Sequence, residues 1–385
     1  MQHGSHPDLV HFALAVGGFA IGTTEFASMS LLPYFARDLG ISAPTAGHVI
    51  SAYALGVVLG APLIAVLSAR LARRSLLIGL MLVFALANGL TGLSPSYPAM
   101  MLFRFLSGLP HGAYFGVAML VAASLVPHER RAQASARVLM GLTAATIIGV
   151  PCANWLGQFV GWRWGFAIVA VLALLTATLV ALFAPHQPPE EGASPLTELS
   201  ALGNPNVLLT LGIGAIGFGG FFAVYTYLAD TLLTVTHLSE SLVPLVFAIF
   251  GCGMMTGLVV VPRYAHGRLM TVAGACLLWF AATMALYSFL TFNVWTITAA
   301  VFAIGLGGAL GPVLQTRLMD VAGRAQTLAA ALNHSAFNFA NALGPWLGGM
   351  VIAHGAGLSS TGLVGTVLAL SGFAIWAVAL KIGHE

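Results

Sequence analysis

Charged side chains are scarce in this chain. Asp, Glu, Lys and Arg together make up 6% of the 385 residues, whereas apolar residues make up 59% and the mean hydropathy is +0.95. A water-soluble globule of this length needs far more charge on its surface. The scarcity of charge therefore excludes an ordinary soluble domain and predicts that lipid is the solvent for most of the protein.

Lysine and the common catalytic motifs are also missing. Lys381 is the only lysine, so the chain has no GxxxxGK[ST] loop to bind ATP phosphates. Neither an HExxH nor a GxSxG pattern occurs, which argues against a membrane protease or esterase. The three cysteines lie in apolar segments without metal-ligand spacing. We therefore expect no enzyme, no cofactor and no metal site.

Long apolar segments fill most of the chain. A hydrocarbon core about 30 Å thick takes about 20 helical residues to cross, and twelve segments reach that length. Their continuous apolar character favours helices over barrel strands, which would alternate. The sequence predicts an all-α membrane protein with twelve transmembrane helices, at 11–32, 45–68, 75–94, 98–125, 133–157, 162–184, 206–231, 241–262, 269–290, 294–319, 326–352 and 358–381.

The longest polar break divides the chain into two similar halves. It includes the run HQPPEEGASP, which is typical of a flexible linker. We expect an N-terminal six-helix bundle at 1–185, a linker at 186–205 and a C-terminal six-helix bundle at 206–385. The pattern F-x-x-G-L at 105–109 recurs at 302–306, and W-L-G at 155–157 recurs at 346–348. Such a repeat is expected of a transporter whose site lies between its halves.

The basic residues predict the orientation, because loops rich in Arg and Lys stay in the cytoplasm. Gaps on the side of the N-terminus hold Arg70, Arg73, Arg74, Arg130, Arg131, Arg137, Arg263, Arg268, Arg317, Arg324 and Lys381, and gaps on the other side hold Arg37 and Arg163. Both termini and the linker should therefore be cytoplasmic. The basic residues form no continuous patch, so nucleic acid is not an expected partner.

Glu25 is the most unexpected residue, because it falls well inside the first apolar segment. A carboxylate at that depth is costly, so it should face a cavity, pair with a cation or carry a proton. Arg104 lies at a matching depth in the fourth segment and is the natural partner of Glu25. His111, seven residues further on, falls on nearly the same helix face, and its imidazole titrates near physiological pH. Proton coupling by these residues, a structural ion pair and a kink at His111 remain alternatives.

Polar residues also mark one face of the eleventh segment. His334, Asn338 and Asn341 follow i, i+4, i+7 spacing, and Tyr225 and Tyr227 lie in the seventh segment. The five side chains either line a route for a polar solute or hydrogen-bond neighbouring helices. Elsewhere, the fifth segment contains Gly149-Val150-Pro151, a predicted kink in a helix that must flex.

Several motifs together resemble the major facilitator superfamily, and within it the bacterial drug and sugar efflux group of arabinose-efflux type. The resemblance spans essentially the whole chain and rests on GTTEF at 22–26, ARLARR at 69–74, RFLSGLPHGAYFG at 104–116, GVPCANWLGQFVGWRWGF at 149–166 and ALNHSAFNFANALG at 331–344. It implies proton transfer at Arg104 and an antiporter motif around Gly149 and Pro151.

The loops between the second and third segments of each half depart from the family pattern. The family places an Asp before the arginines there, and this chain has none in either loop. The arginines of these loops, which are Arg70, Arg73, Arg74, Arg263 and Arg268, can still bond the carbonyl ends of neighbouring helices. We interpret them as gating or structural residues.

The sequence as a whole favours a proton-coupled exporter in the bacterial inner membrane. Its substrate is expected to be a small sugar-like or amphipathic, drug-like solute, with protons and membrane lipid as the other partners and a monomer as the working unit. The alternatives are a uniporter or importer of the same fold, in which Glu25 and Arg104 form a structural pair, and a membrane receptor that does not transport.

Overall fold

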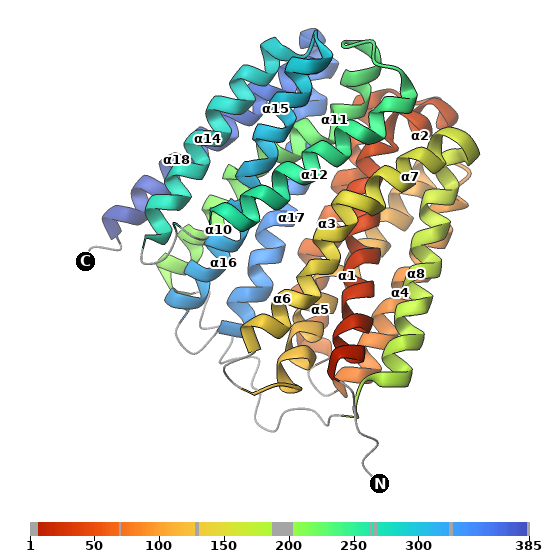
Figure 1. Ribbon diagram of the computed structural model, residues 1–385, viewed down its shortest axis with the longest axis vertical. Helices are drawn as coiled ribbons and strands as arrows, with labels where there is room; N and C mark the ends of the chain where they lie inside the picture. The colour runs from red at the N-terminus through yellow and green to blue at the C-terminus, as the bar shows by residue number, and fades with distance from the viewer. Residues whose placement is uncertain are drawn as a thin grey trace.

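The computed structural model is a bundle of long helices, most of which run nearly parallel to one axis (Figure 1). It describes residues 7–68, 71–127, 131–186, 203–261, 264, 268–322 and 326–382, without the side chains of 65–66, 131–133, 135–136 and 326–331. No strand occurs among these residues. Ten of the helical stretches in the described part are long and apolar enough to cross a membrane, in agreement with the predicted helical membrane protein.

Within the described residues, the first half of the chain has eight α-helices and two π-helical segments. They are α1 (Pro7–Ser30), α2 (Leu32–Leu39), α3 (Ala43–Leu67), α4 (Arg73–Gly92), α5 (Tyr97–Ser124), α6 (Arg131–Ala144), the π-helical η2 (Ala145–Gly149), α7 (Val150–Leu156), the π-helical η3 (Gly157–Gly161) and α8 (Trp162–Phe183). The predicted kink near Gly149 and Pro151 is therefore a π-helical insertion, after which Pro151 stands in the first turn of α7. The backbone stays helical through this insertion, because Gly149 and Val150 keep right-handed helical dihedral angles.

The second half has the same general layout. Its elements are α10 (Pro205–Gly217), α11 (Gly219–Thr234), η5 (Glu240–Leu242), α12 (Val243–Val260), α14 (Leu269–Leu290), α15 (Val294–Leu306), η6 (Gly307–Ala309), α16 (Leu310–Val321), α17 (Gln326–Val351), η7 (Ile352–Ala356), η8 (Leu358–Ser360) and α18 (Thr361–Ile382). Most of the predicted linker, from 187 to 202, lies outside the described residues.

Several predicted helices are interrupted in the structure. The first ends at Ser30, and a separate short helix, α2, follows it. The seventh is broken at Phe218, between α10 and α11, and the tenth is broken by the 3₁₀ turn η6. Gly217 and Gly219 flank the break at Phe218, and Gly307 and Gly308 lie in η6, which weakens the helix locally. The break after Ser30 has no flanking glycine and is followed by Pro33 in the first turn of α2. Continuous hydrophobicity predicted the spans correctly but carries no information about such breaks.

Glycines bring two helices of each half into close contact, and the contacts repeat. A Cβ added to Gly56 would lie 2.1 Å from the Phe105 carbonyl oxygen, and one added to Gly253 would lie 2.3 Å from that of Phe302. The second pair lies 197 residues after the first, since 253 − 56 and 302 − 105 give the same difference. The pairing of α3 with α5 therefore recurs in the pairing of α12 with α15. This recurrence supports the predicted duplication of a six-helix unit.

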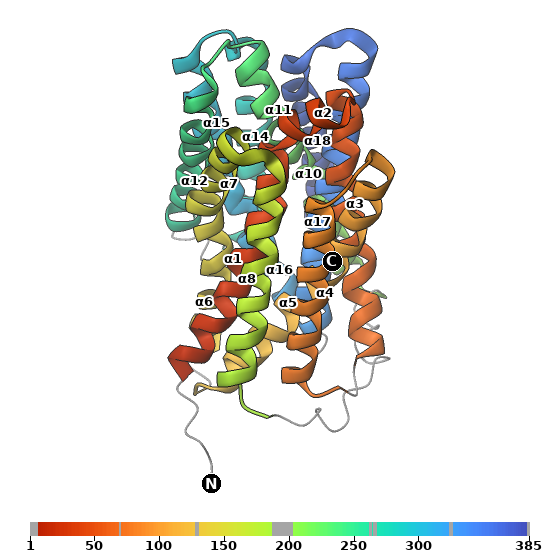
Figure 2. The ribbon, with the colours of Figure 1, turned by 90° about the vertical axis from the view of Figure 1, so that its right-hand side faces the viewer.

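The two halves meet along α3 and α17, which run side by side in both views (Figures 1 and 2). Ser51 donates a hydrogen bond of 2.8 Å to the Ala342 carbonyl across this contact. A Cβ on Gly47 would lie 2.0 Å from the Tyr227 hydroxyl oxygen, so the halves touch without a gap at this point. The contact lies toward the end of the molecule that is remote from the N-terminus (Figure 2), which we call the distal end.

Candidate functional site

Glu25 lies in the last third of α1, at the boundary between the two halves of the chain. Its side chain is 6% exposed, and the surrounding helix is apolar. Asn341 of α17 donates a hydrogen bond from Nδ2 to Glu25 Oε1 at 3.2 Å. The carboxyl group predicted to lie deep in the membrane therefore bonds directly to the opposite half. Any movement between α1 and α17 must change the surroundings of this carboxyl.

Arg104 is fully buried in α5 and is held by hydroxyl groups of α1. Its Nη1 donates to Thr24 Oγ1 at 3.0 Å, and its Nη2 donates to Ser28 Oγ at 3.2 Å. The guanidinium also lies 4.2 Å from the centre of the Tyr53 ring, within the range of a cation–π contact. Arg104 Nε has no hydrogen-bond partner. The site therefore holds a desolvated cation, one nitrogen of which has no hydrogen-bond partner.

Glu25 and Arg104, predicted as partners, do not form an ion pair in this conformation. No nitrogen of Arg104 lies within 4.0 Å of a Glu25 oxygen, although both residues are described and both lie near the contact of α1 with α5. The physical reason is local: Thr24 and Ser28 follow i, i+4 spacing on α1 and occupy both ends of the guanidinium fork. The carboxyl and the cation are therefore neighbours with separate hydrogen-bond partners.

His111 continues this polar network along α5. Its Nδ1 is 2.9 Å from the Tyr53 hydroxyl, so Tyr53 touches both Arg104 and His111. The Phe115 ring lies 5.4 Å from His111 and stacks on His334 of α17, with 4° between the two planes. The structure thus places the predicted His111 and His334 against the same phenylalanine, at the boundary between the halves.

The remaining predicted binding residues have different surroundings. Tyr225 is buried in an aromatic cluster with Phe26 and Phe250, and its hydroxyl has no partner. The Tyr227 hydroxyl instead donates to the Pro345 carbonyl at 2.9 Å, which places Tyr227 in the packing of α11 against α17. Asn338 donates to the carbonyl of the preceding turn, while its Oδ1 is buried without a partner. Tyr225 and Asn338 therefore keep unused polar atoms, whereas Tyr227 does not.

The predicted gating residues are only partly described. Arg70 and Arg263 lie outside the described residues, Arg73 begins α4, and Arg268 is exposed immediately before α14. Arg74 donates to the Ala181 carbonyl in the last turn of α8. Such a contact agrees with the expectation that a loop arginine bonds the carbonyl end of a helix.

The distal end carries its own polar contacts between the halves. Gln158 Nε2 in η3 donates to the Glu240 carbonyl at 2.5 Å, and Arg37 of α2 is 3.8 Å from the Glu240 carboxylate. Next to them, Arg163 and the Trp162 indole both donate to Asp38. These hydrogen bonds, that from Arg163 foremost, hold the pKa of Asp38 below its ordinary value.

Sequence reasoning did not single out the groups that hold Arg104. These are Thr24, Ser28 and Tyr53, together with Asn88, whose Oδ1 accepts a hydrogen bond of 2.6 Å from Thr24. One signal was available for Asn88, because an amide in the middle of an apolar helix needs a partner. The hydroxyls of Thr24 and Ser28 gave none, since such residues often bond their own helix.

Comparisons with known proteins establish the family. The model of the Major Facilitator Superfamily matches residues 14–273, so the chain belongs to this superfamily of membrane transporters. An Escherichia coli protein named inner membrane transport protein YdhP is 41% identical over 366 residues, which cover 93% of this chain and 92% of that protein. A chloramphenicol resistance protein of Streptomyces lividans is 35% identical over 376 residues, which cover 94% of this chain and 95% of that protein.

A solved structure has the same fold. It is a bacterial homologue of the human lysosomal transporter Spinster, in an inward-facing and unoccupied conformation, with a TM-score of 0.72 over 98% of both chains. The identity is 17%, so this likeness concerns the fold alone. The fold and the relatives together show a transporter and not an enzyme, as the sequence predicted.

Proposed function

We propose that this protein is a proton-coupled antiporter that exports a small amphipathic, drug-like or sugar-like solute across the bacterial inner membrane. The observation that carries the proposal is the hydrogen bond between Asn341 and Glu25, which ties a buried carboxyl of one half to the other half. A group that exchanges a proton between the two sides must change its surroundings when the halves move. Glu25 meets this requirement, because the one hydrogen-bond partner of its carboxyl group among the described residues, Asn341, belongs to the opposite half.

The neighbouring residues have distinct parts in the proposed cycle. Arg104 provides a fixed positive charge beside Glu25, since a guanidinium does not deprotonate under these conditions. The charge favours loss of the Glu25 proton when solute is present and the site opens to the cytoplasm. His111 and Tyr53 continue the network and provide a route for the proton. The free Nε of Arg104 remains available to a polar atom of the solute.

The solute is proposed to bind between the halves, close to Glu25. Tyr225 and Asn338 have unpartnered buried polar atoms there, and the wall around them is aromatic and apolar. Such a wall suits a solute with an apolar body and a few hydroxyl or carbonyl groups. The chloramphenicol resistance protein among the relatives supports a solute of this kind.

Alternating access follows from relative movement of an N-terminal bundle, 1–185, and a C-terminal bundle, 206–385, joined by the linker at 186–205. Residues Gly149 and Pro151 provide a flexible point in the first bundle, and the loop arginines Arg70, Arg73, Arg74, Arg263 and Arg268 steady the helix ends. We propose that both termini lie in the cytoplasm, as the excess of basic residues on that side indicates. The distal end is then periplasmic, and a monomer completes the cycle.

The direct test is transport by the purified protein in sealed proteoliposomes with an imposed pH gradient. Radiolabelled chloramphenicol and arabinose serve as probes, and Glu25→Gln is compared with wild type. An antiporter moves the probe in the direction opposite to proton flow. Glu25→Gln is expected to lose this dependence on the pH gradient, but it should still exchange labelled for unlabelled probe when the probe concentration is equal on both sides of the membrane. Movement that ignores the pH gradient supports the uniporter, and binding without movement supports the receptor.

A further inference from the structure

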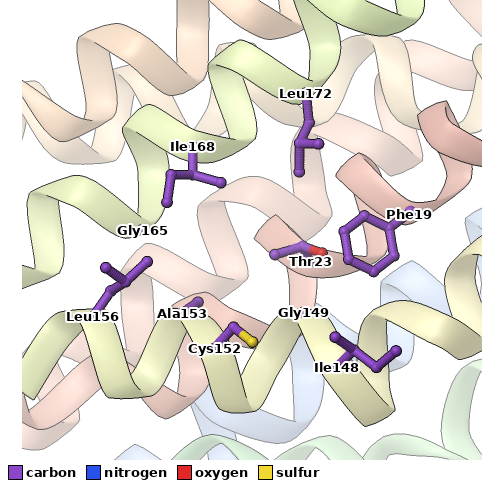
Figure 3. A pocket seen from close by; sticks show the side chains of 10 residues that line it. All are labelled: Phe19, Thr23, Ile148, Gly149, Cys152, Ala153, Leu156, Gly165, Ile168 and Leu172. Carbon is purple, nitrogen blue, oxygen red and sulfur yellow. The ribbon is translucent and has the colours of Figure 1, made fainter.

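A small pocket opens on the outer surface of the first half. It has a volume of about 100 Å³ and lies between α1, η2, α7 and α8 (Figure 3). The residues that line it are Phe19, Thr23, Ile148, Gly149, Cys152, Ala153, Leu156, Gly165, Ile168 and Leu172. The lining is apolar except for the Thr23 hydroxyl and the Cys152 thiol, so the pocket has no group that could bind a charged ligand.

The pocket lies directly behind the proton-coupling site. Thr23 is two residues before Glu25 on α1, and its hydroxyl is buried without a hydrogen-bond partner. A Cβ on Gly149 would lie 2.3 Å from this hydroxyl oxygen, so α1 and η2 are in close contact beside the pocket. The opposite face of η2 touches the second half, because a Cβ on Gly251 would lie 3.0 Å from the Thr146 carbonyl oxygen. A molecule in the pocket therefore contacts η2, which packs against α1 of the first half and α12 of the second.

The mouth of the pocket is continuous with the surface that faces lipid. Ile148 and Ile168 at the rim are exposed, as is Cys152. Ile168 and Leu172 lie six and ten residues into α8, or about 9–15 Å from its distal end. In a hydrocarbon core about 30 Å thick, this depth approaches the midplane, where acyl chains end.

The size of the pocket decides which hydrophobic group fits. Pockets for drug-sized ligands measure roughly 300–1,000 Å³, several times more than this one. A cavity of about 150 Å³ lined by apolar residues accepts a molecule as small as benzene. A pocket of about 100 Å³ therefore accepts a few methylene groups and is too small for a whole exported solute.

We propose that this pocket binds the terminal segment of one phospholipid acyl chain. The chain end would pack against Phe19, Leu156 and Leu172 and support the π-helical bend from outside. The proposal is independent of which solute the protein exports and of whether a proton is exchanged.

The test is photocrosslinking in lipid nanodiscs with phosphatidylcholine that carries a diazirine at the end of one acyl chain. A second lipid, with the diazirine next to the glycerol, serves as the depth control, and adducts are mapped by mass spectrometry. The chain-end probe is expected to label 148–156 and 168–172 in preference to other exposed apolar helices. Cys152→Phe fills the mouth of the pocket and should lower this labelling about tenfold. Each buried methylene group raises the binding constant of the acyl chain by a factor of about four, so the loss of one to two methylene contacts gives a decrease of this size.

Two variants separate the possible occupants. Cys252 is also free and exposed, on α12, so Cys252→Phe adds the same ring away from the pocket and should leave the labelling unchanged. Thr23→Val keeps the shape and removes the hydroxyl, and a hydrocarbon occupant should bind as well or better. Labelling that is even over all lipid-facing helices, or that survives Cys152→Phe, would overturn the proposal. Loss of labelling in Thr23→Val would also overturn it, because the occupant would then be a hydrogen-bonding molecule.

Discussion

Asn341 on α17 donates a hydrogen bond of 3.2 Å to the carboxyl group of Glu25 on α1, and the two residues are 316 positions apart in the chain. The bond joins the two halves at a buried point, where water cannot replace a lost partner cheaply. Arg104 stands beside this bond but uses its donors on Thr24 and Ser28. The carboxyl can therefore change partner without releasing the cation.

Asn341→Ala is expected to reduce coupled transport about tenfold or more, because a hydrogen bond to a charged group contributes about 1.5–3 kcal/mol. Gradient-driven uptake in proteoliposomes measures the effect. Asn154→Ala is the matched comparison, since the Asn154 amide is also buried but donates to the Ser30 carbonyl and not to Glu25. Equal losses in the two variants would mean that the contact between Asn341 and Glu25 has no special part in coupling.

Arg104→Lys is expected to abolish most of the coupled transport and to lower the thermal stability. A lysine ammonium cannot reproduce the planar fork that reaches Thr24 and Ser28 together, nor the stacking on Tyr53. Tyr53→Phe keeps the ring under the guanidinium and removes only the hydroxyl that contacts His111. We therefore expect normal stability but slower proton-coupled transport in Tyr53→Phe, measured by thermal unfolding in detergent and by uptake. Full activity of Arg104→Lys would contradict this account of the site.

Gly47→Ala is expected to hinder closure of the distal end. The added Cβ would lie 2.0 Å from the Tyr227 hydroxyl oxygen, so the halves must separate or the tyrosine must move. In protein whose free cysteines, Cys152, Cys252 and Cys276, are replaced by serine, spin labels at Arg37→Cys and Glu240→Cys should report a longer distance in this variant by electron paramagnetic resonance. Gly79 has open space around it, so Gly79→Ala should leave the distance unchanged. Tyr227→Phe in the Gly47→Ala protein should restore much of the closure, and failure to do so would locate the obstruction elsewhere.

Asp38→Asn is expected to lower the melting temperature slightly at neutral pH and to have no effect in strong acid. Bonding to Arg163 and Trp162 depresses the pKa of Asp38 in the folded protein. The ionised carboxylate therefore contributes to the free energy of unfolding above the ordinary aspartate pKa of about 3.9, and this contribution is lost as the pH falls through the lower pKa of the folded state. The pair is nearly half exposed, so the contribution should stay below about 1 kcal/mol. Thermal unfolding of both proteins across this pH range measures it. A difference that persists in strong acid would assign the effect to another cause.

The sequence was sufficient for the helical membrane fold, because hydrophobic length reports directly on a bilayer. It also predicted Glu25, Arg104 and His111 as candidate site residues, since polar groups at such depth are costly and therefore conspicuous. It did not predict that Thr24 and Ser28 separate Arg104 from Glu25, because small hydroxyl residues occur in membrane helices for many reasons. The break after Ser30 depends on tertiary packing, which single-sequence patterns do not encode. At η2 the sequence predicted a kink near Gly149 and Pro151 but not its π-helical form.

Proton release upon solute binding tests the central claim most directly. Purified protein in unbuffered detergent is mixed with chloramphenicol or with arabinose, and the pH is followed in wild type and in Glu25→Gln, with calorimetry to confirm binding. The account predicts that a solute which binds wild type acidifies the medium, and that Glu25→Gln binds it without any change in pH. Confirmed binding to wild type with no proton release would contradict the antiport mechanism and favour a uniporter.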